Sequence, residues 1–408
     1  ATNSYNTAVG MNAGRLVTSG IQNTIIGGLA GDALTGGGFS GDTRQVGADF
    51  NTVVGVTALG GDTKGNKSTA IGYSTLVAQN FTSSTDTFNT AVGYEAGAAV
   101  TTGIDNTLIG GLAGDALQDA DANVAVGKQA LTRDTLGSKS TAVGFNTLAD
   151  QNFTSATESG NTAMGYNAGG AVTIGTKNTL VGAESGDAIT IGRYNTTLGY
   201  AALTTDIDGD FSTAIGFGAL QTQESDGANQ AVHNTAVGSY AGNGLTTAIH
   251  STFVGGFAGG NAALTGDNNT GVGYRSMYSN TSGSENTGLG KDALFSNTVG
   301  AYNTAVGEGA LYTNVDGSNS VAVGRLALYN QDPASAVNMY NVAVGYEAGG
   351  AVTTGIQNTL IGGLAGTFAT TADSSTFIGH QAGQGITGAK LTGNDNTAVG
   401  KDAGLLLQ

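Results

Sequence analysis

The feature that most constrains this chain is a five-residue core, Asn/Ser-Thr-small-aliphatic-Gly, which recurs along its whole length. The core occurs 22 times, from Asn6–Gly10 to Asn396–Gly400, and 14 of the 21 intervals between its closing glycines follow one 17-residue period. A 17-residue period is too short for a helix pair and fits one coil of a solenoid. β-Branched residues and glycines favour strands in each coil. The sequence therefore predicts an all-β fold, a parallel β-solenoid (β-roll or β-helix) of about 22 coils with a 17-residue period.

The repeat predicts a single continuous domain over residues 1–408, with extra residues in loops where the interval is longer than one period. These loops are expected at residues 32–50, 77–88, 149–160, 221–233, 329–340 and 384–395. Pro333, the only proline, lies in one of them, as expected for a residue that cannot donate to a strand ladder. Loops on a rigid solenoid can carry recognition. Because these segments are small and polar with few aromatic residues, the preferred interpretation is that they are solvated spacers or fill grooves between protomers.

Composition excludes several classes of protein. The 39% hydrophobic content, together with 70 glycines, indicates repetition rather than disorder. A net charge of −16 repels polyanions, so nucleic acid is not an expected partner. No apolar run approaches the roughly 20 residues that cross a bilayer, and no basic-then-apolar leader is present, so membrane insertion is not expected. The absence of cysteine excludes disulfides and thiolate chemistry.

Stacked parallel coils place equivalent side chains in ladders about 4.8 Å apart. The leading Asn is expected to bond its own copies along the stack, and the closing Gly is expected where a β-carbon would clash. The residues predicted to form this structural ladder are Asn89, Asn106, Asn161, Asn178, Gly93, Gly110, Gly127, Gly144, Val92, Ile109, Val126 and Val143.

Strand alternation puts the second and fourth core positions on one face and the first, third and fifth on the other. We expect the aliphatic fourth position to line the coil interior, so that the third position forms an outer apolar face that needs a partner. When the third core residue is bulky, as Leu108 is, the residue after the core glycine is often Gly, here Gly111. When the third core residue is Ala, the residue after the core glycine is often Tyr. One large side chain per coil would then fill one interface site, which favours a homo-oligomer over a monomer. The predicted interface residues are Leu108, Phe253, Leu360, Phe377, Tyr94 and Tyr166.

Catalytic and metal chemistry has little support in the sequence. His233, His250 and His380 are expected at different places in their coils, so no Ser-His-Asp or Cys-His set is indicated. We therefore expect no enzymatic activity and no cofactor. The run Asp206, Asp208 and Asp210 has the alternating oxygens of a calcium loop but lacks a distal glutamate. It is a candidate calcium site, and a solvated acidic turn is the preferred interpretation.

The residues Asn319-Ser320-Val321-Ala322-Val323-Gly324, followed by Arg325-Leu326-Ala327, resemble the head repeat of trimeric autotransporter adhesins, although the present coil is longer. The commoner form, as in Asn89–Gly97, is similar to repeats of bacteriophage tail-fibre proteins. The resemblance implies a homotrimeric extracellular fibre, on a virion or a cell surface, that attaches to a host cell. Its implied partners are copies of itself, end-to-end or as a trimer, with a cell-surface receptor or glycan as a further possibility.

The expected function is therefore the non-enzymatic, adhesive shaft of an extracellular attachment fibre. A bacterial surface adhesin or a matrix filament made by end-to-end stacking is the alternative. An ice-binding protein is a third hypothesis, because Thr ladders on a flat solenoid face can order water. Two expectations count against it: the ladder Thr shares a face with the core aliphatic residue, and tandem Thr-x-Thr is not repeated.

Overall fold

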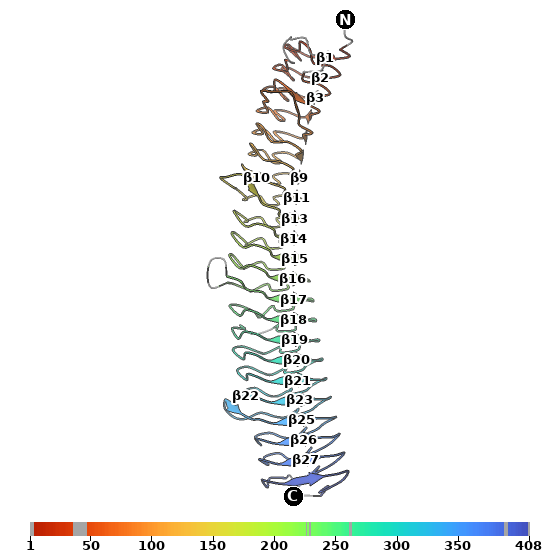
Figure 1. Cartoon of the computed structure of the whole chain (residues 1–408), viewed down its shortest axis with the longest axis vertical. Coiled ribbons are helices and arrows are strands. Elements are labelled where there is room, and N and C mark those ends of the chain that lie inside the picture. Colours follow the sequence, from red (N-terminus) through yellow and green to blue (C-terminus); the bar gives the residue numbers. More distant parts are fainter. Residues whose placement is uncertain are drawn as a thin grey trace. The chain divides into compact units, whose positions relative to one another are not determined.

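The computed structural model describes residues 4–35, 47–225, 227, 230–260, 263–386 and 391–406 (Figure 1). These residues form strands, turns and bends, and no helix is found among them. The chain divides into two compact units, residues 1–198 (unit 1) and 199–408 (unit 2). The expectation of one continuous domain stays a prediction.

Each unit is a parallel β-solenoid in which every coil contributes one three-residue main strand. The main strands of unit 1 are β1 (Thr7–Val9), β2 (Thr24–Ile26), β3 (Thr52–Val54), β5 (Thr69–Ile71), β7 (Thr90–Val92), β8 (Thr107–Ile109), β9 (Val124–Val126), β11 (Thr141–Val143), β13 (Thr162–Met164), β14 (Thr179–Val181) and β15 (Thr196–Leu198). Those of unit 2 are β16 (Thr213–Ile215), β17 (Thr235–Val237), β18 (Thr252–Val254), β19 (Thr270–Val272), β20 (Thr287–Leu289), β21 (Thr304–Val306), β23 (Val321–Val323), β25 (Val342–Val344), β26 (Thr359–Ile361), β27 (Thr376–Ile378) and β28 (Thr397–Val399).

Neighbouring main strands within a unit pair in a register that aligns equivalent core positions. In the β7–β8 pair, Ala91 lies opposite Leu108 and Val92 opposite Ile109. The described residues contain 22 such strands, one for each core. The predicted all-β parallel solenoid, with its 17-residue period and about 22 coils, is therefore confirmed.

Three of the longer coils add a second, two-residue strand pair to the solenoid. These pairs are β4 (Gly65–Asn66) with β6 (Thr85–Asp86), β10 (Gly137–Ser138) with β12 (Thr157–Glu158), and β22 (Gly317–Ser318) with β24 (Val337–Asn338). The segments expected as loops at 77–88, 149–160 and 329–340 thus each include a short strand. Residues 36–46, 226, 228–229 and 387–390, within the other expected loops, lie outside the described residues.

The inward face of the main strands is opposite to the one that we expected. The third core position lines the coil interior, and Leu108, for example, is 0% exposed. The second and fourth positions point outward: Ile109 is 39% exposed, and Val92, Val126 and Val143 are half-buried. Strand alternation was predicted correctly, but the assignment of the two faces was wrong. Ala is common at the third position because the opposite wall of the coil supplies the larger side chain.

That larger side chain stands four residues after the core glycine. A β-carbon on Gly97, at this place in its coil, would lie 2.7 Å from Leu108 Cδ1 and 2.9 Å from Leu76 Cδ2. A β-carbon on Gly111 would meet nothing within 4 Å. We expected the third core residue and the residue at the place of Gly111 to compensate for each other's size at an interface. The compensation instead takes place inside the coil, between the third core residue and the residue at the place of Gly97.

Candidate functional site

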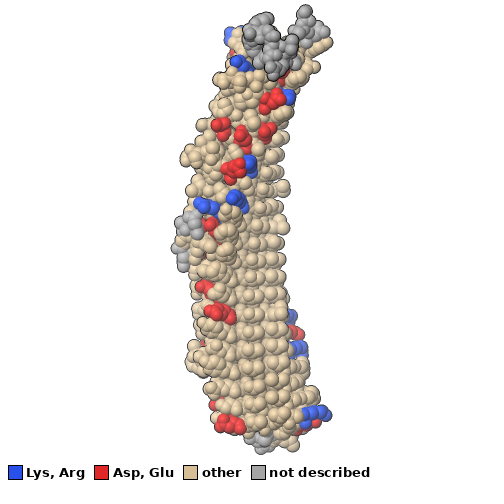
Figure 2. Space-filling view, in the orientation of Figure 1, with Lys and Arg blue, Asp and Glu red and all other residues tan. Residues whose placement is uncertain are grey.

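The main candidate for an interaction surface is the side of the solenoid formed by the second and fourth positions of the main strands, which we call the outer strand face. Its two columns hold Thr or Val at the second position and Val, Ile, Leu or Met at the fourth. None of these positions in the 22 main strands carries a charge. Figure 2 shows regular rows of uncharged side chains down the middle of the lower part of the view, with small groups of charged residues along its left and right edges and in the upper part.

Aromatic side chains flank the outer strand face at the position after the core glycine. Tyr94 and Tyr166 are each 55% exposed. The Tyr94 ring stacks on Tyr73 with centroids 5.4 Å apart, and the Tyr166 ring stacks on Phe145 at 5.8 Å. Both predicted interface tyrosines therefore lie where another molecule can reach them.

The other four predicted interface residues lie inside the coils. Leu108, Phe253, Leu360 and Phe377 are all fully buried within the single chain. They cannot contact a sister chain, because each occupies the third core position and packs on interior glycines such as Gly114 and Gly259. Their assignment to an interface was wrong for the same reason as the assignment of the strand faces.

The leading asparagines form a buried ladder that links the backbones of successive coils. Asn89 Oδ1 accepts a hydrogen bond from the backbone N–H of Asn106 at 2.9 Å, and Asn106 Nδ2 donates to the carbonyl of Ala120 at 2.7 Å. Asn161 Oδ1 accepts from the N–H of Asn178 in the same way, at 2.9 Å. Each side chain thus satisfies buried backbone groups that the short main strands leave without partners.

The longer coils hold a buried polar network that sequence reasoning missed. Gln79 Nε2 donates to Asp62 Oδ2 at 2.7 Å and to Ser68 Oγ at 2.9 Å, and Asn89 Nδ2 donates to Gln79 Oε1 at 2.9 Å. Asp62 Oδ1 accepts from the N–H of Gly65 at 3.0 Å. Burial raises the pKa of the Asp62 carboxyl, against the opposing effect of these hydrogen bonds. The same network recurs around Asp134 and Gln151.

A third copy of this network contains the calcium candidate. Gln223 Nε2 donates to Asp206 Oδ2 at 2.6 Å, and the N–H of Gly209 donates to Asp206 Oδ1 at 3.1 Å. Asp206 is buried, whereas a solvated acidic turn was the preferred interpretation. Among the described residues, Asp206, Asp208 and Asp210 form no cluster suited to a metal ion. The sequence signal that would have revealed the network is an Asp followed by a Gln one 17-residue period later, at 62/79, 134/151 and 206/223.

Two of the three histidines occupy the same place in neighbouring coils, so the expectation of three different places was wrong. The His233 ring stacks on Phe211 at 4.9 Å and on His250 at 5.7 Å. His380 follows a core glycine and belongs to a different column. The arrangement is that of a side-chain stack.

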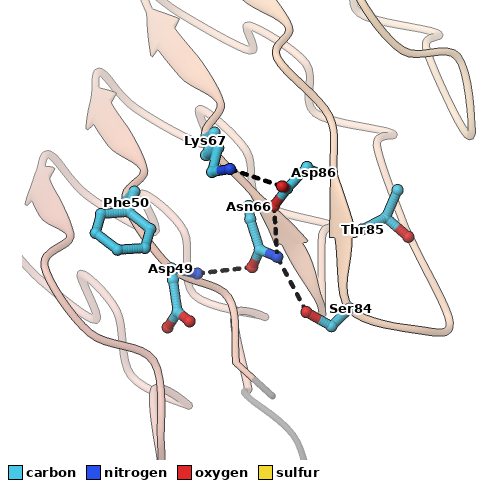
Figure 3. A pocket seen from close by; sticks show the side chains of 7 residues that line it. All are labelled: Asp49, Phe50, Asn66, Lys67, Ser84, Thr85 and Asp86. Carbon is cyan, nitrogen blue, oxygen red and sulfur yellow. Dashed lines mark hydrogen bonds and ion pairs between the residues drawn. The ribbon is translucent and has the colours of Figure 1, made fainter. Parts of the chain in front are cut away.

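A polar pocket of about 530 Å³ lies beside β4 and β6 in unit 1 (Figure 3). Lys67 Nζ lies 2.6 Å from Asp86 Oδ2, and Asn66 Nδ2 donates to Ser84 Oγ at 3.0 Å. Asn66 Oδ1 accepts from the N–H of Asp49 at 2.9 Å, as Figure 3 shows. Its polar side chains are therefore largely engaged with one another.

Comparison of the chain with protein-family models and with curated protein sequences finds no match in either. The structure contains no helix, within its described residues, that is long and apolar enough to cross a membrane.

Proposed function

We propose that this chain is the non-enzymatic shaft of an extracellular attachment fibre, assembled as a homotrimer through the outer strand face. The observation that carries the proposal is the complete absence of charge at the partly exposed second and fourth positions of the main strands, in unit 1 and in unit 2 alike. Charged residues are otherwise the usual way in which a solvent-facing sheet is kept from association. An uncharged, aliphatic face of this kind is typical of a surface covered by another protein.

The width of the face favours packing around an axis parallel to the solenoid. Each main strand presents only two outward side chains, and the register keeps the Thr and the aliphatic columns continuous within each unit. Copies related by a rotation about a parallel axis would bring identical columns together coil by coil, which gives a closed assembly. The resemblance to trimeric fibre repeats supports three copies. Attachment at a surface is the role that the same resemblance supports.

The proposal is tested by charging the outer strand face at three separated coils. Light scattering of the wild-type protein should give an assembly with three times the chain mass of 40.2 kDa. The triple variant Val126→Lys, Val272→Lys and Ile361→Lys should be monomeric, because burying three unpaired ammonium groups per chain outweighs the apolar gain.

The matched control places the same three charges four residues earlier, at exposed positions outside the strands. Ala122→Lys, Asn268→Lys and Gln357→Lys should leave the trimer intact. Lysine already occupies this place in other coils, at Lys67 and Lys139. A monomeric wild-type chain, or a trimer in both variants, would contradict the proposed interface.

Ice binding is a second candidate, because one observation now favours it. The threonine column lies on the outer strand face and not in the core, so one of the two arguments made against this function from the sequence no longer holds. The other argument, that tandem Thr-x-Thr is not repeated, still counts against it. An exposed flat Thr ladder and a trimer buried through the same face exclude one another. A monomer that shows thermal hysteresis would establish this function in place of the fibre, and a trimer without hysteresis would remove it.

A further inference from the structure

One column of side chains in unit 2 is aromatic in four consecutive coils. The rings of Tyr278, Phe295, Tyr312 and Tyr329 stack in that order, with centroids 5.3, 4.9 and 5.0 Å apart. The angles between the planes of successive rings are 4°, 6° and 14°. All four rings are half-buried, so the column is part of the surface. Such spacings are those of offset stacked rings.

The backbone register shows which residue follows the last ring. The N–H of Thr313 donates to the carbonyl of Tyr329 at 3.1 Å, and one coil further the N–H of Asn330 donates to the carbonyl of Gly350 at 3.2 Å. Gly350 therefore occupies the place of a fifth ring but has no side chain. Thr367 follows it in the same register, since its carbonyl accepts from Ala351 N–H at 2.8 Å.

A cavity of about 270 Å³ lies where the fifth ring is missing. Tyr329, Asn330, Glu347, Gly350, Thr367 and Phe368 line it, with two aliphatic side chains. None of them belongs to a main strand, so the cavity is separate from the outer strand face. The volume is at the small end of ligand sites and suits one ring rather than an oligomer.

The polar groups of the cavity define the chemistry of a ligand. Asn330 Nδ2 donates to the carbonyl of Gly350 at 2.9 Å, which fixes the amide and leaves its Oδ1 as an acceptor. Thr367 Oγ1 donates to the carbonyl of Leu364 at 2.9 Å. The half-buried Glu347 side chain, whose carboxylate also interacts with the Tyr346 hydroxyl, is a further acceptor and disfavours an anionic ligand. The matching ligand has one apolar ring face and hydroxyl donors around its edge.

We propose that this cavity binds a single neutral pyranose ring of a glycan, stacked on Tyr329 in place of a fifth aromatic side chain. The C–H face of the sugar lies against the Tyr329 ring, and its hydroxyls donate to Glu347 and Asn330. This adds a ligand class to the proposed attachment role, but it requires only the folded solenoid. A monomeric chain is therefore expected to bind the sugar as well.

Unit 1 provides an internal comparison at residues 166–172, where the sequence Tyr-Asn-Ala-Gly-Gly-Ala-Val nearly repeats residues 346–352. The N–H of Asp150 donates to the carbonyl of Gly170 at 3.1 Å, so Gly170 has the place of Gly350. Ala149, Asn167 and Ala188 stand at the places of Tyr329, Glu347 and Phe368. Asp150 and Asp187 stand at the places of Asn330 and Thr367, so the polar groups differ as well. This coil has the same backbone but no aromatic platform and no carboxylate at the place of Glu347, so we expect no sugar binding there.

The test is saturation-transfer NMR of the full chain with methyl glycosides of glucose, galactose, mannose and N-acetylglucosamine at millimolar concentration. At least one glycoside should receive saturation, most strongly at the protons of its apolar face. Tyr329→Ala and Glu347→Gln should each weaken binding at least about tenfold. Tyr278→Ala, which removes the ring at the far end of the same stack, should bind like the wild type.

Three outcomes would overturn the proposal. One is that no glycoside binds the wild-type chain, and another is that Tyr329→Ala binds as the wild type does. The third is that phenol or indole binds in a Tyr329-dependent way while no glycoside does, which would assign the cavity to an aromatic ligand. If Tyr329→Ala does not fold, as thermal unfolding would show, Glu347→Gln decides, because it leaves the stack intact. The oligomeric state, measured on the same samples, reports separately on the proposed trimer.

Discussion

At the scale of single residues, the core glycine is the position at which the fold tolerates substitution least. Its φ lies between +120° and +146° in the described coils, a region that residues with a β-carbon rarely adopt. A β-carbon on Gly93 would lie 2.4 Å from the carbonyl oxygen of Gly110 in the next coil. Both the conformation and the close approach of two backbones therefore require glycine.

Gly93→Ala should lower the free energy of unfolding by about 3 kcal/mol, since backbone strain and a backbone clash add together. Chemical denaturation followed by circular dichroism measures the loss. Gly111→Ala is the matched control, because a β-carbon there meets nothing within 4 Å. Equal stability of the two variants would contradict the close coil-to-coil contact at Gly93.

The asparagine ladder leads to a second prediction at this scale. Asn106→Ala would leave the carbonyl of Ala120 and the N–H of Asn123 without their buried partners. The expected cost is about 3 kcal/mol, from two unsatisfied buried backbone groups. Thermal unfolding of Asn106→Ala should therefore begin well below that of the wild type. Exposed Asn268→Ala serves as the control, and a similar loss there would show that the effect is not specific to the ladder.

At the scale of elements, two of the longer coils, those of β4–β6 and β10–β12, combine an extra strand pair with a buried carboxylate. Asp62 is held by hydrogen bonds from Gln79 and from backbone N–H groups. The equivalent residue in the β22–β24 coil is Asn314, whose Oδ1 accepts from Gln331 Nε2 at 3.0 Å. The network therefore accepts a neutral side chain in one of its copies.

Asp62→Asn should change how stability depends on pH. Burial raises the pKa of Asp62 in the folded chain, so the folded state binds more protons than the unfolded state between the ordinary and the raised pKa. Stability supplied by this group is present at low pH and falls as pH rises through that window. The difference in melting temperature between Asp62→Asn and the wild type should therefore grow in favour of the variant from acid to neutral pH. A difference that does not vary with pH would contradict the raised pKa.

The sequence was sufficient to predict the solenoid but not its inward face. A 17-residue repeat with β-branched residues determines the coil and its register, because every coil must satisfy the same contacts. Alternation shows only which residues share a face of the strand. A face with Thr at the second core position and Val at the fourth can point either into the coil or outward. The complementarity of Gly97 with Leu108 was the decisive signal, because two residues that exchange volume must face one another.

Serine at the first core position is another signal that became clear only with the structure. All six serines precede an interval longer than the usual period, as Ser68 and Ser140 do. In the coil of Ser68 the inserted segment occupies the space of an Asn side chain, and its Thr87 Oγ1 lies 2.7 Å from Ser68 Oγ. The position of the cavity at Gly350 could not be predicted, because it depends on which side chains of three successive coils meet there.

At the scale of the whole molecule, charge and apolar surface are kept apart. The chain carries a net charge of −16, yet the outer strand face has no charged position. Association through this face would gain from burial of apolar surface and would be opposed by repulsion between like-charged chains. Exposed ion pairs such as Lys67–Asp86 lie outside the main strands and contribute little to the association.

The proposed trimer should therefore become more stable as the salt concentration rises. Raising sodium chloride from about 0.05 to about 0.5 M screens the repulsion between chains and leaves the apolar contact in place. Sedimentation equilibrium should show a smaller dissociation constant at the higher salt concentration, and sulfate should strengthen association further. Dissociation on adding salt would instead indicate an interface held by ion pairs, which the composition of the outer strand face cannot provide.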